Sequence, residues 1–188
     1  MAAFWIAFFF VLIAEMGDKT QLMTLTFATR YRARTVLAAV LIATLVIHLF
    51  SVSLGEAIGL ALPLFWINLL AGIIFVCFGL WTLRQEEAVN ERSPSRARFG
   101  PLITVAATFF LAEIGDRTML ATVMIASRQR SFFGVWFGST AGMVLANGLA
   151  IMVGRLLGKR LPEKLLHYGT ALIFVISGLF ALVEALRP

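Results

Sequence analysis

The chain alternates between long uncharged stretches and short charged breaks. Four uncharged stretches approach or exceed the roughly 20 residues that a helix needs to cross the hydrocarbon core of a membrane. They cover residues 35–55, 57–83, 131–154 and 165–183. This pattern predicts four ordinary membrane-spanning helices.

Two further apolar stretches are each interrupted by a cluster of charged residues. The first runs from 1 to 29 with its charges within 15–19, and the second runs from 99 to 127 with its charges within 113–117. Both are longer than the bilayer requires, which is typical of a tilted or discontinuous helix at a transport site. The sequence therefore predicts an all-α membrane protein with six transmembrane helices.

The interrupted stretches belong to a repeat that extends along the chain. Residues 14–20, AEMGDKT, match residues 112–118, AEIGDRT, at an offset of 98. We assign one transport domain to residues 1–188, made of repeat one (1–83), a charged linker (84–100) and repeat two (101–188). Because three spans per repeat is an odd number, the second repeat starts on the opposite side of the bilayer. The two are expected to be inverted three-helix repeats, as in many secondary transporters.

Composition and charge agree with this class. The chain is 60% hydrophobic and 14% charged, whereas soluble domains have about 25% charged residues. The net charge of +6 comes from basic residues in breaks between apolar stretches, so we expect no nucleic-acid binding. With the N-terminus outside, eleven basic residues fall on the inner side and three on the outer side. Since inner loops carry the basic excess, both termini are predicted outside.

Small residues recur every four positions in the fifth predicted span. Gly134, Gly138 and Gly142 stand where repeat one has Thr35, Ala39 and Ala43. Such rows let helix backbones approach closely in lipid. Plain helix packing is the expected role, and a sliding surface is the alternative.

The charged clusters place four carboxylates at membrane depth. Glu15 and Asp18 are three residues apart, as are Glu113 and Asp116, so each pair is expected to share one helix face. A carboxylate at the bilayer centre costs roughly 2.5–3.5 kcal/mol on insertion scales, which makes it a functional candidate by default. If the repeats face each other, all four carboxylates converge on one region.

Charge balance indicates what such a region binds. Lys19 and Arg117 offset two of the four negative charges, and the two that remain equal one divalent cation or two protons. The donors are oxygen atoms, which suit Ca²⁺, Mg²⁺ and Mn²⁺. The hydroxyls of Thr20 and Thr118 are further candidate ligands, and the amide of Gln21 is a weaker one. His48 is a weak candidate for proton transfer.

Several alternatives remain open at this stage. Glu15 with Lys19, and Glu113 with Arg117, can form inert pairs four residues apart, although these leave Asp18 and Asp116 without partners. Threonine hydroxyls in membrane helices often bond the carbonyl one turn back. Lone polar groups in a bundle, here His48, Asn147 and Asn68, usually bond a neighbouring helix.

This charge balance fits a protein that exchanges a divalent cation for protons. The alternatives to such an exchanger are a passive cation channel and a non-transport membrane scaffold. A channel moves cations without moving protons, and a scaffold moves neither. An enzyme is not expected, because no nucleophile–base pair is visible and no cofactor is indicated. The partners expected are a divalent metal ion, protons and membrane lipid.

The doubled motif E-x-G-D-[KR]-[ST], present as EMGDKT and EIGDRT, resembles the signature of the GDT-type cation/proton exchangers. The resemblance covers the whole chain. It implies that Glu15, Asp18, Glu113 and Asp116 are cation ligands, with contributions from Thr20 and Thr118. It also implies export of Mn²⁺ or Ca²⁺ against protons by alternating access. Since the chain lacks the N-terminal extension of eukaryotic members, we expect a bacterial plasma-membrane protein that exports manganese.

Overall fold

A computed structural model describes residues 1–84, 100–157 and 163–186, and within these ranges all regular secondary structure is α-helical. Almost all of the predicted linker 84–100 lies outside the described residues. The helices are α1 (Ala2–Glu15), α2 (Lys19–Arg30), α3 (Ala33–Ala61), α4 (Leu64–Arg84), α5 (Pro101–Glu113), α6 (Arg117–Gln129), α7 (Phe132–Leu157) and α8 (Glu163–Ala185).

Three helices are long and apolar enough to cross a membrane unaided. They are Ala33–Ala61, Leu64–Trp81 and Phe132–Val153, and shorter apolar helices cover Ala2–Glu15, Pro101–Glu113 and Ala171–Ala185. The described helices therefore support the all-α fold and the membrane class that the sequence predicts.

One predicted boundary is wrong. The span expected to begin at residue 57 belongs partly to α3, which continues past Glu56 to Ala61, and the chain turns at Leu62 and Pro63. A glutamate does not end a helix. A proline does, because it lacks an N–H and forces the residue before it into an extended conformation, as Leu62 adopts with φ −113° and ψ 141°.

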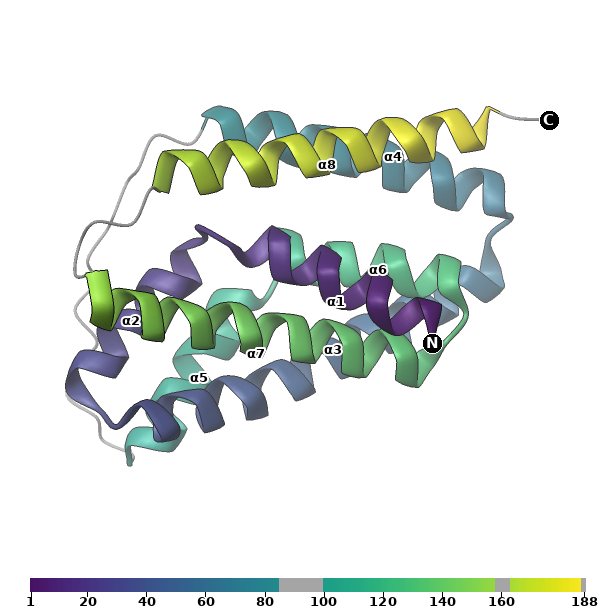
Figure 1. The fold of residues 1–188 in the computed structure, drawn as a ribbon. Helices are drawn as coiled ribbons and strands as arrows, with labels where there is room; N and C mark the ends of the chain where they lie inside the picture. Colours follow the sequence, from purple (N-terminus) through teal and green to yellow (C-terminus); the bar gives the residue numbers. More distant parts are fainter. Residues whose placement is uncertain (85–99, 158–162, 187–188) are drawn as a thin grey trace.

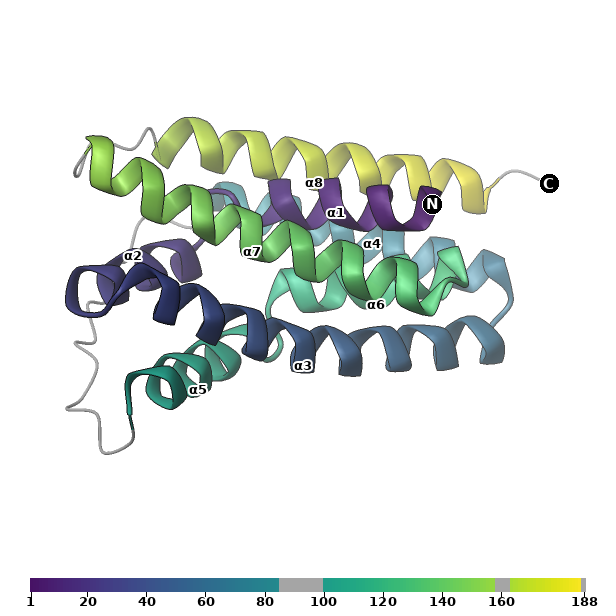
Figure 2. The same cartoon turned by 60° about the horizontal axis from the view of Figure 1, so that its bottom comes forward.

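The helices form a main bundle with a two-helix layer beside it (Figure 1). The layer consists of α4 and α8, which lie against each other. Helix α4 contacts α3 and α6 of the bundle, and α8 contacts α1. Helix α1 begins and helix α8 ends at the same end of the molecule, whereas α5 begins at the opposite end (Figures 1 and 2). Helices α1 and α5 thus run in opposite directions.

Polarity is distributed inside out compared with a water-soluble protein. Large apolar side chains are exposed along the helices, among them Trp5 and Phe50, whereas Glu15, Glu113 and Asn147 are buried. A lipid environment favours this arrangement, because charged and polar groups then face the interior of the bundle.

Glycines bring neighbouring helices into backbone contact, as between α7 and α1 and between α3 and α6. A Cβ atom on Gly142 of α7 would lie 2.5 Å from the Phe8 carbonyl oxygen of α1, and one on Gly138 would overlap the Phe4 carbonyl oxygen. On α3, a Cβ atom on Gly59 would lie 2.5 Å from the Ser127 carbonyl oxygen of α6. The small-residue row predicted on α7 therefore packs closely against α1.

Candidate cation site

Each interrupted span consists of two helices separated by a short break. The first break lies between α1 and α2 and contains Gly17 with φ 79°, and the second lies between α5 and α6 and contains Gly115 with φ 74°. Glycine adopts this left-handed conformation readily, whereas other residues pay a steric penalty for it. Of the two alternatives expected from the sequence, a tilted or a discontinuous helix, the structure has the discontinuous one.

The same breaks correct the expectation that Glu15 and Asp18 share a helix face. Glu15 is the last residue of α1, and Asp18 is the extended N-cap residue of α2. Glu113 and Asp116 have the same relation in repeat two. Because the helix ends between the two acids, helical spacing does not apply to them. The positive N-terminal ends of α2 and α6 face this region instead, which favours negative charge there.

The two glutamates are buried at equivalent positions. Glu15 is 0% exposed and Glu113 is 1% exposed. The Thr20 hydroxyl donates a hydrogen bond to Glu15 and lies within reach of Glu113, and the Thr118 hydroxyl donates to Glu113 Oε2 at 2.9 Å. These hydroxyls bond carboxylates rather than the carbonyls one turn back.

Each glutamate keeps one oxygen free of hydrogen bonds. Glu15 Oε2 and Glu113 Oε1 are buried and have no hydrogen-bond partner within the part of the chain that the structure describes. A buried carboxylate oxygen without a partner is costly, so each of these atoms is suited to binding a proton or a cation.

The two aspartates form ion pairs that cross between the repeats. Arg117 of repeat two contacts Asp18 of repeat one, and Lys19 Nζ of repeat one lies 3.3 Å from Asp116 Oδ1 of repeat two. The alternative pairing of each lysine or arginine with a glutamate four residues earlier does not occur among the described residues. Both aspartates have partners, in contrast to what that alternative required.

The crossed pairs differ in exposure. The side chains of Arg117 and Asp18 are 10% and 9% exposed, whereas those of Lys19 and Asp116 are 65% and 13% exposed. One pair is thus buried, and the other is open on its lysine side.

All four acids are close enough to repel one another, since Glu15 interacts electrostatically with Glu113, Asp18 and Asp116. They nevertheless do not form one ready ligand set. Across residues 1–84, 100–157 and 163–186, no group of three or more His, Cys, Asp or Glu side chains is arranged to hold a metal ion. Each aspartate instead contacts a basic side chain of the other repeat.

Two side chains of the predicted spans connect the first break to α7. Asn147 Nδ2 of α7 donates to Glu15 Oε1 at 3.3 Å. Gln21 Oε1 accepts from the Gly17 N–H at 2.8 Å, and Gln21 Nε2 donates to the Ala146 carbonyl at 3.0 Å. Asn147 was expected only as a helix-to-helix hydrogen bond, and its proximity to Glu15 depends on packing that the sequence does not reveal. Gln21, predicted as a weak ligand, uses both amide atoms to hold the break.

Comparison with known proteins identifies the family of the chain. The family described as "Divalent cation/proton antiporter GDT1" matches residues 3–90 and 101–188. The chain belongs to this GDT1 family. The family is one of transporters and not a class of enzymes, so membrane cation/proton antiport is the activity with which this chain is associated.

Three relatives of this GDT1 chain span most of its length. A protein of Vibrio cholerae serotype O1 named "Putative manganese exporter" is 33% identical, with 90% of this chain and 84% of the relative covered. "GDT1-like protein sll0615" of Synechocystis is 29% identical, with 98% and 97% covered. "GDT1-like protein 5" of Arabidopsis thaliana is 25% identical, with 91% of each covered. No solved structure matches the chain.

His48 lies apart from these contacts in the GDT1 chain. Its side chain is buried, and Nδ1 is 3.3 Å from the Thr140 hydroxyl of α7. This is a hydrogen bond between α3 and α7, the ordinary role for a lone polar group in a helix bundle.

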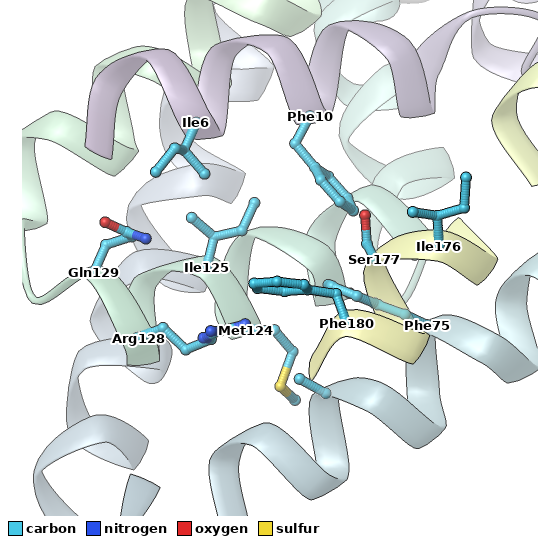
Figure 3. A pocket seen from close by; sticks show the side chains of 11 residues that line it. Ile6, Phe10, Phe75, Met124, Ile125, Arg128, Gln129, Ile176, Ser177 and Phe180 are labelled. Carbon is cyan, nitrogen blue, oxygen red and sulfur yellow. The ribbon is translucent and has the colours of Figure 1, made fainter. Parts of the chain in front are cut away.

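A cavity of about 360 Å³ lies between α1, α4, α6 and α8 (Figure 3). Its walls are mostly apolar, including Phe10, Phe75 and Phe180. The charged side chain that lines it, Arg128, forms an ion pair with Glu184 of α8. The lining contains no carboxylate, so the cavity is separate from the acid cluster and is a poor match for a cation.

Proposed function

We propose that this GDT1-family chain exports Mn²⁺, Ca²⁺ or both, driven by protons that enter through the same site. The observation that carries the proposal is the pair of buried glutamates at equivalent positions, each with one oxygen that lacks a hydrogen bond to any residue that the structure describes. A transported proton or cation would complete the bonding of both.

The charges of the site support exchange of one divalent cation for two protons. Arg117 and Lys19 neutralise Asp18 and Asp116 through the crossed ion pairs, which leaves the charges of the two glutamates. One divalent cation neutralises both, and so do two protons. A site that is neutral in either state avoids leaving a net charge in a low-dielectric interior.

The proposed ligands are all oxygen atoms, which Mn²⁺ and Ca²⁺ accept. Glu15 and Glu113, with the hydroxyls of Thr20 and Thr118, form the inner set, and Asp18 and Asp116 join it when their basic partners move away. The name of the Vibrio relative makes Mn²⁺ the first cargo to test.

The proposed topology is six membrane spans in two inverted repeats that work by alternating access, with both termini outside a bacterial plasma membrane. The support is that α1 begins and α8 ends at one end of the molecule and that α1 and α5 begin at opposite ends (Figure 1). The breaks in the first and fourth spans then lie at the middle of the bilayer, where transporters with inverted repeats bind their cargo.

Flux in reconstituted vesicles tests the proposal. Vesicles containing the full chain, with indicators for Mn²⁺ and protons inside and an acidic interior, are exposed to external Mn²⁺, Ca²⁺ or Mg²⁺. We expect Mn²⁺ or Ca²⁺ to enter as protons leave, with the flux reduced when the pH gradient is collapsed. Glu15→Gln and Glu113→Gln should each remove both fluxes, while Glu56→Gln, outside the cluster, should keep them. Cation entry that moves no protons would identify a channel, and the absence of any flux would favour a scaffold.

A further inference from the structure

The crossed ion pairs place two basic side chains on the two aspartates of the proposed site. Lys19 and Arg117 each directly follow an aspartate of their own repeat, yet each contacts the aspartate of the other repeat. The arrangement occurs twice, so it follows from the doubled motif.

An aspartate oxygen that is paired with an ammonium group binds a divalent cation less strongly than an unpaired aspartate oxygen does. Lys19 Nζ lies 3.3 Å from Asp116 Oδ1, and a cation bound to the same carboxylate would be repelled by the ammonium charge. For Asp116 to become a ligand, Lys19 has to move away.

The two pairs should differ in how easily they break. The Lys19 side chain is 65% exposed, whereas the Arg117 side chain is 10% exposed. We take the open side of Lys19 to face the aqueous access path of the proposed transporter, where water competes for both charges and an ion pair contributes little stability. A buried pair is hard to separate because an unpaired buried charge is left behind. Asp116 is therefore the aspartate that an incoming cation binds first.

The backbone around the second break supports this order. Ile114 is 53% exposed and Gly115 is exposed, whereas their counterparts Met16 and Gly17 are partly buried. The second break is thus more exposed than the first, and the partner of Asp116 is more exposed than the partner of Asp18, although the two aspartate side chains themselves are 13% and 9% exposed.

We propose that Lys19 is a specificity-determining residue, a tethered competitor that occupies Asp116 until a divalent cation displaces it. The inference rests on the proposed function. A monovalent ion that replaces the ammonium group brings no more charge than the group it displaces, whereas a divalent ion does. Lys19 thus lowers the apparent affinity for all cations but discriminates most strongly against Na⁺ and K⁺.

Binding measurements on the purified full chain test this role. We expect Lys19→Gln to bind Mn²⁺ about two- to fivefold more tightly than the unchanged chain, the range set by an exposed ion pair. Na⁺ should compete with Mn²⁺ measurably better in Lys19→Gln, while Lys19→Arg should keep the original selectivity. In the Asp116→Asn background, Lys19→Gln should no longer improve the affinity, because the competitor has no carboxylate to occupy. An equal gain in that background would mean a general charge effect and would overturn the proposal.

Chemical labelling of Lys19 provides a second readout. The chain contains three lysines, so Lys159→Arg with Lys164→Arg leaves Lys19 as the single lysine to be acetylated and followed by mass spectrometry. We expect Mn²⁺ to increase the labelling of Lys19, and Asp116→Asn to make labelling high with or without Mn²⁺. Labelling that ignores Mn²⁺ in a chain that binds and transports it would refute the role of Lys19 alone. If the unchanged chain binds neither Mn²⁺ nor Ca²⁺, the proposed function is refuted as well.

Discussion

Arg117 and Asp18, 99 residues apart in the sequence, form a buried ion pair between the two repeats. Each follows a helix break, and each lies at the start of a half-helix, Arg117 in α6 and Asp18 as the N-cap residue of α2. The contact joins the two breaks directly, so the integrity of the acid cluster depends on it.

Loss of Arg117 should therefore destabilise the protein far more than loss of Lys19. Arg117→Gln leaves Asp18 buried without its partner, at a cost of about 3–5 kcal/mol, whereas Lys19→Gln removes an exposed pair worth at most about 1 kcal/mol. Thermal unfolding of the purified chains in detergent measures both. The double variant Arg117→Gln with Asp18→Asn should recover much of the loss, and a double variant as unstable as Arg117→Gln would contradict the pairing.

The break glycines should resist substitution because of their backbone conformation. Gly17→Ala and Gly115→Ala each place a Cβ atom on a residue with positive φ, which costs roughly 1–2 kcal/mol. At Gly115 a Cβ atom meets no atom within 4 Å among the described residues, so the loss there is purely conformational. Gly169→Ala, within α8 and equally free of close neighbours, should stabilise instead. Equal effects of Gly115→Ala and Gly169→Ala on unfolding would show that the positive φ has no energetic importance.

Two glycines of α7 offer a matched comparison for helix packing. A Cβ atom at Gly138 overlaps the Phe4 carbonyl of α1, while one at Gly148 lies 3.7 Å from the nearest described atom, in Leu37. Gly138→Ala should destabilise by about 1–3 kcal/mol through overpacking, and Gly148→Ala should be neutral or stabilising. Unfolding of both variants side by side measures the difference, and similar stabilities would argue against close contact of α1 with α7.

His48 should be important for stability more than for proton movement. His48→Gln retains a group that can bond Thr140, so proton-coupled Mn²⁺ flux in vesicles should remain near that of the unchanged chain. His48→Ala removes the hydrogen bond and leaves space in the bundle, and should lower the free energy of unfolding by about 1 kcal/mol or more. A His48→Gln variant that moves Mn²⁺ but no protons would give His48 a place in the proton path.

The sequence was most informative where backbone chemistry decides the outcome. The length and charge of the two interrupted stretches predicted a tilted or discontinuous helix, and the breaks form at Gly17 and Gly115, because few residues other than glycine accept a left-handed conformation. The doubled motif also predicted the family. The end of α3 was not predicted correctly. A charged residue, Glu56, suggested a boundary, but the helix continues to Ala61 and Pro63 ends it.

Side-chain partners could not be predicted in the same way. Within one repeat, spacing made Glu15 and Lys19 the natural pair. The observed partner of Lys19 is Asp116, 97 positions along the chain, and this contact arises only when two half-helices from different repeats meet. The bond from Asn147 to Glu15 likewise requires α7 to lie against α1.

The glycine contacts between α7 and α1 have a consequence for a cell that stores energy as a proton gradient. Where the backbone of one helix touches the carbonyls of the next, as at Gly142 and Phe8, no file of water molecules can pass between them. This close packing therefore excludes water, and with it a hydrogen-bonded path for protons, from the interface between α1 and α7 at these glycines.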